Sequence, residues 1–247
     1  IIYPPEIFKK LQQCRTRTSL ELLILDIELG RFFGNACIDF IAKYDIPHLD
    51  FIASHGHTVF HFPLRNISLQ IGSGQMISAI SGVKTLCSLR SNDIAHGGQG
   101  APIVPIGDVL FFPDYTYCLN LGGIMNISIK NSENIISFDI GPCNQVLNHL
   151  ANRLGKEYDK DGIFASQGRL HLALFEELNQ VGYFLTSPPK SLDNDFSNQL
   201  LSIIDIYIHN TFISIEDALH TFSHHIAFQI SRYVEPNLPI LCTGGGS

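Results

Sequence analysis

The feature that most constrains the fold of this chain is a buried strand that runs directly into an amphipathic helix. An apolar run over residues 135–140 is typical of a buried strand, and Gly141-Pro142 ends it. The helix that follows ends at Gly155 and carries its apolar residues on one stripe: Val146, Leu147, Leu150 and Leu154. This order predicts an α/β protein in which Asp139 lies near the carboxyl end of a strand, beside a helix amino terminus.

Asp139 is therefore the first candidate for chemistry. Open α/β sheets bind their ligands at the carboxyl edge of the strands. The positive end of the helix dipole favours an ionised carboxylate, which is able to take a proton. The alternative is an aspartate that only hydrogen-bonds the amides of its turn, since Asp is a favoured turn residue.

Composition excludes several classes of protein. With 247 residues, of which 45% are hydrophobic and 16% charged, the chain can bury a core as one large domain or two modest ones. A net charge of −7 without a basic run argues against nucleic acid and anionic membrane as partners. The sequence has no apolar run of about 18 residues, and Ile1–Pro5 lacks the pattern of a signal peptide. The six cysteines contain no C-x-x-C pair and indicate free thiols, so we expect a cytoplasmic protein.

The pattern of elements falls into two successive halves, which we assign as a first lobe over residues 1–108 and a second over 109–247.

Gly30 and Gly34 interrupt a long helix, which predicts close packing or an irregularity there. Residues 91–104 are expected to form a loop. The other expected helices begin at Pro4-Pro5-Glu6 or cover 75–81, 171–178, 195–208 and 214–234; the expected strands cover 50–54, 58–62, 67–71, 83–89, 115–121, 126–130, 135–140 and 238–242.

Glycine-rich turns follow two of these strands. Gly122-Gly123 ends one strand, and Thr243-Gly244-Gly245-Gly246 ends another. Turns of this kind let backbone amides approach a phosphate or an adenosine closely. Gly-Gly is also an ordinary hairpin turn, and a terminal glycine run also fits a flexible tail, so the residues alone leave both interpretations open.

Histidines and charged residues near other turns form a second set of candidates. His55 and His57 share one face of an extended segment, but no Cys, Asp or Glu joins them as a zinc site would require, so no metal site is predicted. We expect His55 to act through hydrogen bonds. The remaining candidates lie in glycine- or proline-rich loops, where an exposed loop is the alternative: Arg90, Asp93, Gln99 and Lys190.

Taken together, these segments resemble one family, the anhydro-N-acetylmuramic acid kinases. The matching segments occur in family order over nearly the whole chain. They are His55-Gly56-His57-Thr58-Val59, Leu69-Gln70-Ile71-Gly72, Asp93 to Pro105, Asn120 to Ser128, Phe138 to Asn144, Tyr158 to Gly162, Pro188-Pro189-Lys190-Ser191 and Thr243 to Gly246.

The resemblance implies a two-lobed, ribonuclease H-like fold of the actin and hexokinase type, with ATP and Mg²⁺ in the cleft between the lobes. The implied reaction opens the 1,6-anhydro ring of the sugar with water and phosphorylates O6. Asp139 matches the general base. The implied nucleotide-binding residues are Gly122, Gly123, Asn126, Thr243, Gly244, Gly245 and Gly246, and the implied sugar-binding residues are His55, Arg90, Asp93, Gln99, Asn144 and Lys190.

The chain also departs from the family pattern. His57 replaces a usual Gln, Ser88 replaces a usual carboxylate, and Asp193-Asn194-Asp195 replaces a usual Gly-Arg-Glu. The phosphate-holding hairpin that opens family members, and the elements that follow the last glycine run, including a Glu that assists catalysis, are expected outside this sequence.

Three functions remain open at this point. The first is a kinase represented by part of its sequence, acting on an amino sugar and ATP in peptidoglycan recycling. The second is a relative that binds a muropeptide sugar without catalysis, and the third is a kinase of the same superfold with another small sugar as its substrate. The sequence does not determine the oligomeric state, for which a homodimer is the commonest choice.

Overall fold

The computed structural model describes residues 2–131, 134–192 and 196–247. The chain forms two compact units, Ile1–Ile103 and Val104–Ser247. Both contain helices and strands, which confirms the predicted α/β class. The predicted lobe boundary at residue 108 falls inside helix α5 (Pro105–Phe111), and the assignment of the two units to lobes stays a prediction.

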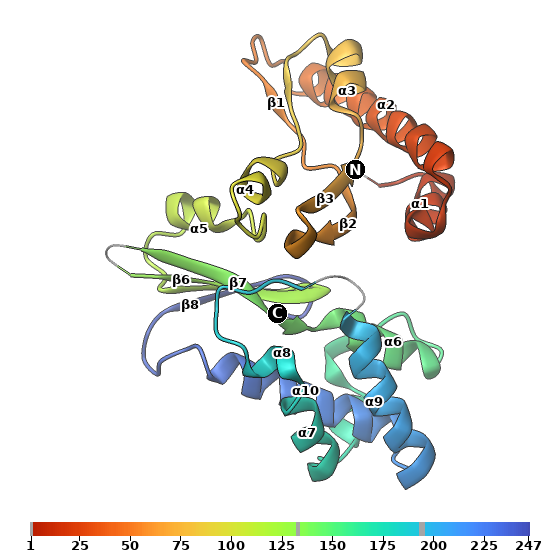
Figure 1. Cartoon of the computed structure of the whole chain (residues 1–247), viewed down its shortest axis with the longest axis vertical. Helices are drawn as coiled ribbons and strands as arrows, with labels where there is room; N and C mark the ends of the chain where they lie inside the picture. Colours follow the sequence, from red (N-terminus) through yellow and green to blue (C-terminus); the bar gives the residue numbers. More distant parts are fainter. Residues whose placement is uncertain (1, 132–133, 193–195) are drawn as a thin grey trace. The chain divides into compact units, whose positions relative to one another are not determined.

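Unit 1 packs helices against two small sheets (Figure 1). Strands β1 (Ile52–Ala53) and β4 (Thr85–Leu86) pair in parallel, while β2 (His57–Phe62) and β3 (Ile67–Ile71) form an antiparallel hairpin. Both β1 and β4 are shorter than predicted. The helices are α1 (Pro5–Gln12), α2 (Ser19–Lys43), α3 (Gly74–Ser81) and α4 (Ser91–Ala95).

Helix α2 is the longest element of unit 1. Thr18 and Glu21 form a capping box that fixes its start. The predicted close packing is confirmed where α2 meets the segment that contains α3. A Cβ atom on Gly30 would lie 2.7 Å from the backbone oxygen of Ser73, and one on Gly34 would lie 2.9 Å from Ile80.

Unit 2 is built on a four-stranded sheet in the order β7-β6-β5-β8. The strands β5 (Tyr117–Leu121), β6 (Ile124–Lys130) and β7 (Ile135–Pro142) form an antiparallel meander, and β8 (Ile240–Thr243) pairs in parallel with β5. Three antiparallel strands in chain order, followed by a fourth strand parallel to the first, is the order of a ribonuclease H-like sheet. The sheet therefore agrees with the fold that the resemblance implies.

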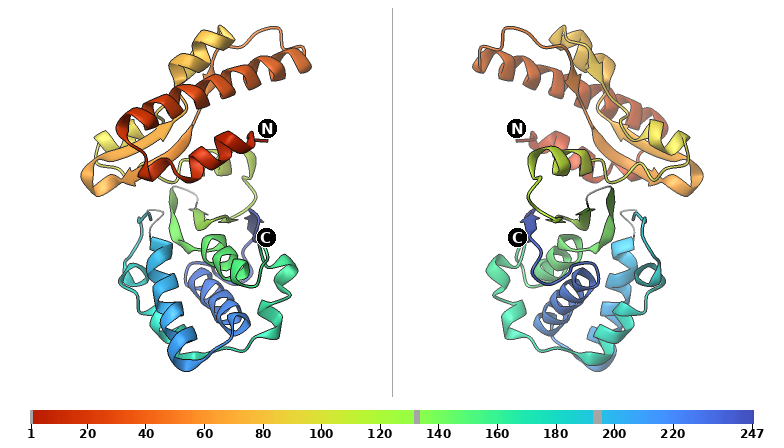
Figure 2. Two further views of the ribbon diagram at one scale, coloured as in Figure 1. Left: turned by 90° about the vertical axis from the view of Figure 1, so that its right-hand side faces the viewer. Right: turned by 90° about the vertical axis from the view of Figure 1, so that its left-hand side faces the viewer.

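The helices that follow β7 in the chain lie on one side of this sheet (Figures 1 and 2). Apolar residues of the sheet, such as Ile127, Phe138 and Ile140, form a fully buried core with Leu150, Phe222 and other residues of those helices. The helices are α6 (Asn144–Arg153), α7 (Leu172–Asn179), α8 (Gly182–Leu185), α9 (Phe196–Thr211) and α10 (Ile215–Ser231).

Two local predictions were wrong. Residues 91–104 do not form one loop, because α4 begins at Ser91 and buries Ile94 before Gly97 ends the turn. Strand β7 does not stop at Gly141, since Gly141 and Pro142 still pair with Met125 and Ile124 of β6. The Asp193–Asp195 departure from the family, the start of the helix predicted from 195 and the middle of the 131–134 turn lie outside the described residues.

Across the described ranges, no helix combines the length and apolar character needed to span a bilayer.

The close approach of α2 to the segment around Ser73 predicts opposite results for two helical glycines. Gly30→Ala should destabilise unit 1, because a backbone oxygen that cannot rotate away obstructs the new methyl group. Overpacking of about 1–3 kcal/mol outweighs the gain in helix propensity of up to about 1 kcal/mol. Urea denaturation measures the change, with Gly107→Ala as the matched control.

Gly107 lies in α5, where a Cβ atom would meet only Phe111 at 3.8 Å. Gly107→Ala should leave stability unchanged or raise it by up to about 1 kcal/mol. Equal effects of the two substitutions would contradict the packing described for α2.

Candidate active site

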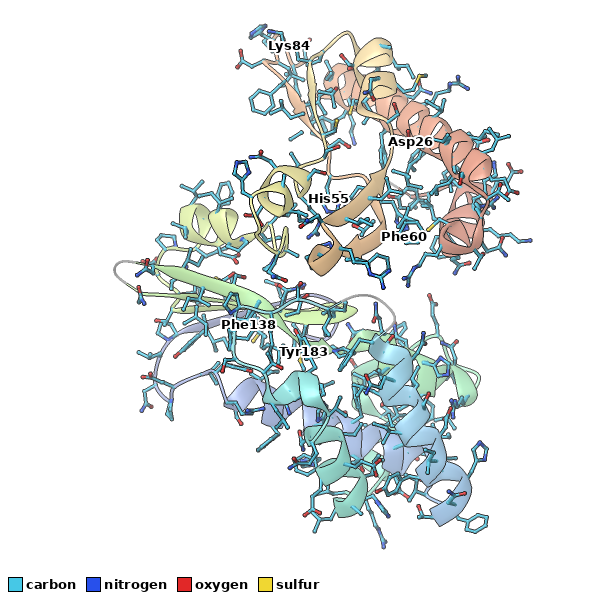
Figure 3. All side chains as sticks on the ribbon, viewed as in Figure 1. Asp26, His55, Phe60, Lys84, Phe138 and Tyr183 are labelled. Atoms are coloured by element: carbon cyan, nitrogen blue, oxygen red, sulfur yellow. The ribbon has the colours of Figure 1, made fainter. Side chains whose placement is uncertain are left out.

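Asp139 lies in β7 and is 8% exposed. The backbone N–H of Leu192 donates to its Oδ2 at 2.9 Å, and its own backbone N–H donates to the carbonyl of Lys190 at 3.0 Å. The hydroxyl of Tyr183 donates to its carbonyl oxygen at 2.6 Å. Figure 3 shows Tyr183 on the side of the sheet that the helices cover. Phe138, the residue before Asp139, is buried on the same side. The aspartate is thus held from several directions by the segment that contains residues 183–192.

Lys190 is buried in unit 2 rather than exposed in a loop. Its Nζ donates to the carbonyl of Tyr183 at 3.0 Å and lies over the rings of Tyr183 and Tyr233, at 4.4 and 5.8 Å from their centroids. Burial, with a smaller effect of Arg232, lowers the pKa of Lys190 to about 8. In this arrangement the ammonium contacts aromatic rings, which differs from the direct sugar or phosphate contact that the resemblance implies.

The amino terminus of α6 is occupied by the glycine turn between β5 and β6. The amides of Cys143 and Gln145 donate to the carbonyl of Gly123, and the amide of Asn144 donates to that of Gly122. The carboxylate of Asp139 receives its described hydrogen bond from Leu192 instead. The prediction that the positive end of this helix favours an ionised Asp139 stays a prediction.

The terminal glycine run packs against the end of β5. The amide of Gly246 and the side-chain Nδ2 of Asn144 both donate to the carbonyl of Leu121, at 3.0 and 2.9 Å. Gly244 has φ of +94°, and a Cβ atom there would lie 2.7 Å from the backbone of Leu121. Parallel pairing of β8 with β5 thus brings together the two glycine segments that the sequence separates by more than a hundred residues.

Asn126 connects this end of the sheet to the aspartate. It pairs with Asn120 of β5 on one side and with Asp139 of β7 on the other. The candidates in unit 2 other than Lys190 therefore lie on neighbouring strands or on the turns and helix that adjoin them: Asp139, Asn126, Gly122, Gly123, Asn144, Thr243, Gly244, Gly245 and Gly246.

In unit 1, three predicted sugar-binding residues form a hydrogen-bonded group around Gly100. Arg90 donates through Nε to Nε2 of His55 at 2.9 Å and through an Nη to the carbonyl of Gly100 at 2.7 Å. Asp93 accepts from the amide of Gly100 at 2.6 Å. Gln99, half-buried, precedes that glycine. The side chains of His55, Arg90 and Asp93 thus fix the loop that presents Gln99.

The protonation state of His55 follows from its neighbours. Its Nδ1 lies 3.0 Å from the carbonyl of Gly56, which requires a proton on Nδ1. Its Nε2 accepts from Arg90 and is therefore unprotonated. Burial is the largest cause that lowers the pKa of His55, and Arg90 lowers it further, in agreement with a neutral ring.

A cavity of about 500 Å³ opens in unit 1 beside His55. It lies at the carboxyl ends of the parallel strands β1 and β4, through Ser54 and His55 after one and Cys87 and Ser88 after the other. Figure 3 labels His55, Phe60 and Asp26, which belong to its lining. Further polar side chains of its lining are Ser19, Gln70, Ser73 and Gln75.

Sequence analysis did not select Asp26. Its Oδ1 accepts from the amide of Gly72 at 2.7 Å, which joins α2 to the end of β3. Asp26 and Glu28 both lie between Leu25 and Leu29, so the sequence offers two carboxylates on this stretch of helix and no signal that selects Asp26. Taken over the described residues, no group of three or more His, Cys, Asp or Glu side chains converges as a metal site.

The burial of Lys190 predicts a specific pH dependence of stability. A pKa of about 8 when folded and about 10.4 when unfolded means that the unfolded chain binds more protons over that range. The free energy of unfolding of the wild type should therefore rise from pH 8 to pH 10, relative to that of Lys190→Met. Denaturant titrations at several pH values measure this difference. Parallel pH profiles for the two proteins would contradict the buried ammonium.

Residues 3–247 match the family described as anhydro-N-acetylmuramic acid kinase. Curated relatives with this name include proteins of Clostridioides difficile (32% identical, covering 93% of this chain and 65% of the relative), Vibrio cholerae (31%, 90% and 64%) and Aliivibrio fischeri (34%, 90% and 64%). The chain thus spans less than two thirds of the length of these relatives.

Among solved structures, the activator of the 2-hydroxyisocaproyl-CoA dehydratase from Clostridium difficile with bound ADPNP matches 79% of this chain and 78% of its own. At 11% identity and a TM-score of 0.35, this likeness carries no argument. The match to the family over residues 3–247 and the identity with the curated relatives show the family directly. The chain belongs to the anhydro-N-acetylmuramic acid kinase family.

Proposed function

We propose that this chain belongs to an ATP-dependent kinase that opens the 1,6-anhydro ring of anhydro-N-acetylmuramic acid and gives N-acetylmuramic acid 6-phosphate. The observation that carries the proposal is the position of Asp139, a buried carboxylate on the strand next to the glycine turn of a ribonuclease H-like sheet. The reaction would serve peptidoglycan recycling in the cytoplasm.

In the proposed mechanism, Asp139 is the general base. The oxygen of a water molecule bonds to C1 of the sugar while Asp139 takes its proton, and the bond from C1 to O6 breaks. O6 then bonds to the γ-phosphorus of ATP, and the bond from that phosphorus to ADP breaks. The amide of Leu192, which donates to Oδ2, favours the ionised carboxylate that this role requires.

The nucleotide would lie against the glycine segments of unit 2. Gly122-Gly123 and Thr243–Gly246 pack at the end of β5, where side chains are absent and backbone can approach a ligand closely. Mg²⁺ would neutralise charge on the phosphates, and it needs only one or two carboxylates besides phosphate oxygens and water.

The sugar would contact the cavity of unit 1. Ligands of α/β proteins bind at the carboxyl ends of parallel strands, which is where this cavity opens. Asp26, His55 and Gln70 supply polar groups for hydroxyl and amide substituents, and Phe60 supplies an apolar wall. The clamp of Arg90 and Asp93 on Gly100 would keep Gln99 and His55 in place for the same ligand.

The first experiment is a coupled ADP-release assay with ATP, Mg²⁺ and the anhydro sugar. It compares this chain with a version extended to the length of the curated relatives. ADP release that depends on the sugar supports the kinase. Sugar binding by calorimetry without ADP release in either version would overturn it in favour of a non-catalytic relative, and turnover only with other sugars would favour a different substrate.

The proposed base predicts the kinetics of Asp139→Asn. Loss of a general base should lower kcat by about 10²–10⁴-fold with little change in substrate affinity. Steady-state kinetics on the active version measure both constants, and Asp114→Asn, at an exposed position, is the matched control. An unchanged kcat in Asp139→Asn would remove Asp139 from this role.

The glycine run predicts a loss of nucleotide affinity in Gly244→Ala. The new methyl group would meet the backbone of Leu121 and displace the run, so the Kd for ATP measured by calorimetry should rise by about tenfold or more. Gly155→Ala controls for strain, because Gly155 also has a positive φ, of +72°, but open space around it. Equal nucleotide affinities of the two variants would count against nucleotide binding at this run.

A further inference from the structure

Three residues around Asp139 form a closed cycle of hydrogen bonds. The amide of Asp139 donates to the carbonyl of Lys190, the ammonium of Lys190 donates to the carbonyl of Tyr183, and the hydroxyl of Tyr183 donates to the carbonyl of Asp139. The distances are 3.0, 3.0 and 2.6 Å. Each residue therefore gives one hydrogen bond and accepts one within the cycle.

The cycle lies in an environment that keeps its donors protonated near neutral pH. Burial is the main cause that raises the pKa of Tyr183 well above its ordinary value, so its hydroxyl keeps its proton. The rings of Tyr183 and Tyr233 face the ammonium of Lys190, an arrangement that stabilises a cation. Lys190 is only 6% exposed.

The cycle also determines where the carboxylate of Asp139 finds its partner. Lys190 lies two positions before Leu192, whose amide donates to Oδ2 of Asp139. Holding the carbonyl of Lys190 on the amide of Asp139 places the Leu192 amide within reach of the side chain. The segment from Lys190 to Leu192 thus fixes both the backbone position of Asp139 and the orientation of its carboxylate.

We propose that Tyr183 and Lys190 are positioning residues, which hold Asp139 in the orientation that a general base requires. This rests on the proposed function for the role of Asp139, and it assigns to Lys190 a task other than contact with sugar or phosphate. A base displaced by about 1 Å costs about 10²-fold in rate. Substitutions in the cycle should therefore lower kcat and leave the KM for each substrate nearly unchanged.

The test compares Tyr183→Phe and Lys190→Met with the control Tyr207→Phe. Tyr183→Phe removes the hydroxyl that donates to the carbonyl of Asp139 and keeps the ring that faces the ammonium. Lys190→Met removes the ammonium that donates to the carbonyl of Tyr183. Tyr207 is matched, since its hydroxyl donates at 2.7 Å to Glu177 in the same unit but outside the cycle. Circular dichroism confirms the fold of each variant.

Two measurements are made on each protein. Hydrogen exchange of the Leu192 amide by NMR should be about two- to tenfold faster in both cycle variants, as expected when one hydrogen bond is lost, and unchanged in Tyr207→Phe. In the version that turns over, kcat should fall by about 10²-fold, with KM values within about twofold of the wild type.

These outcomes separate the positioning role of Tyr183 and Lys190 from the proposed kinase function. If the wild type turns over but the cycle variants keep its kcat, the positioning role is overturned whatever the exchange rates, and the proposed function stands. If no version turns over, the proposed function fails, and the Leu192 exchange rates alone decide whether the cycle orients Asp139. Unchanged exchange in both cycle variants overturns the proposal, and faster exchange with a lower kcat supports it.

Discussion

The parallel pairing of β5 with β8 is the interaction on which unit 2 depends. It joins Cys118 to Leu241 and Asn120 to Thr243, so it closes a chain segment of more than a hundred residues that includes every helix on the covered face of the sheet. Without it, the terminal glycine run would have no contact with Leu121, and the helices between β7 and β8 would be held at one end only. Closing so long a segment costs chain entropy, which the buried apolar core beneath the sheet offsets.

Inside that core, a cluster of three polar side chains links α7 to α10. The side-chain oxygen of Asn179 lies 2.8 Å from Nδ1 of His225 and accepts from Gln229 at 2.7 Å. All three residues are nearly or fully buried, and burial lowers the pKa of His225 to about 4, so its ring is neutral at physiological pH. Gln229 also accepts from Arg232, which donates to the carbonyl of Phe184, the residue after Tyr183. The helical layer and the surroundings of Asp139 are therefore one connected polar structure.

Much of this fold could be predicted from periodicity and from turn residues. The strand 67–71 was predicted with its observed bounds, and the long helix that starts after Thr18 carries a capping box readable in the sequence. Long periodic segments bury a continuous stripe, so their pattern is strong. The helix at Ser91 was missed because a single turn that buries only Ile94 leaves too short a pattern among glycines and prolines.

The candidate site was also predicted only in part. The conjunction of strand, turn and helix around Asp139 made this residue a candidate, but its hydrogen-bond partners could not be predicted. Tyr183 of α8 and Leu192 of the segment that follows reach it through tertiary packing, and nothing in local sequence encodes these contacts. Lys190 was selected as a cation for a ligand, and its partners inside the protein, the carbonyl and the ring of Tyr183, could not be predicted from the sequence. Asp26 was missed because α2 carries several charged residues and the sequence does not show which of them meets another element.

The clamp on Gly100 changes how the glycines of that loop should be interpreted. The amide and the carbonyl of Gly100, which belong to two successive peptide groups, are held by the side chains of Asp93 and Arg90, and a Cβ atom on Gly98 would collide with the carboxylate of Asp93 at 2.2 Å. Glycine is thus required at 98 because an aspartate occupies the space beside it, whether or not a ligand is present. An added or deleted residue between Asp93 and Gly100 would shift Gly100 away from the carboxylate that holds its amide, so the length of this segment is constrained as well as its glycine.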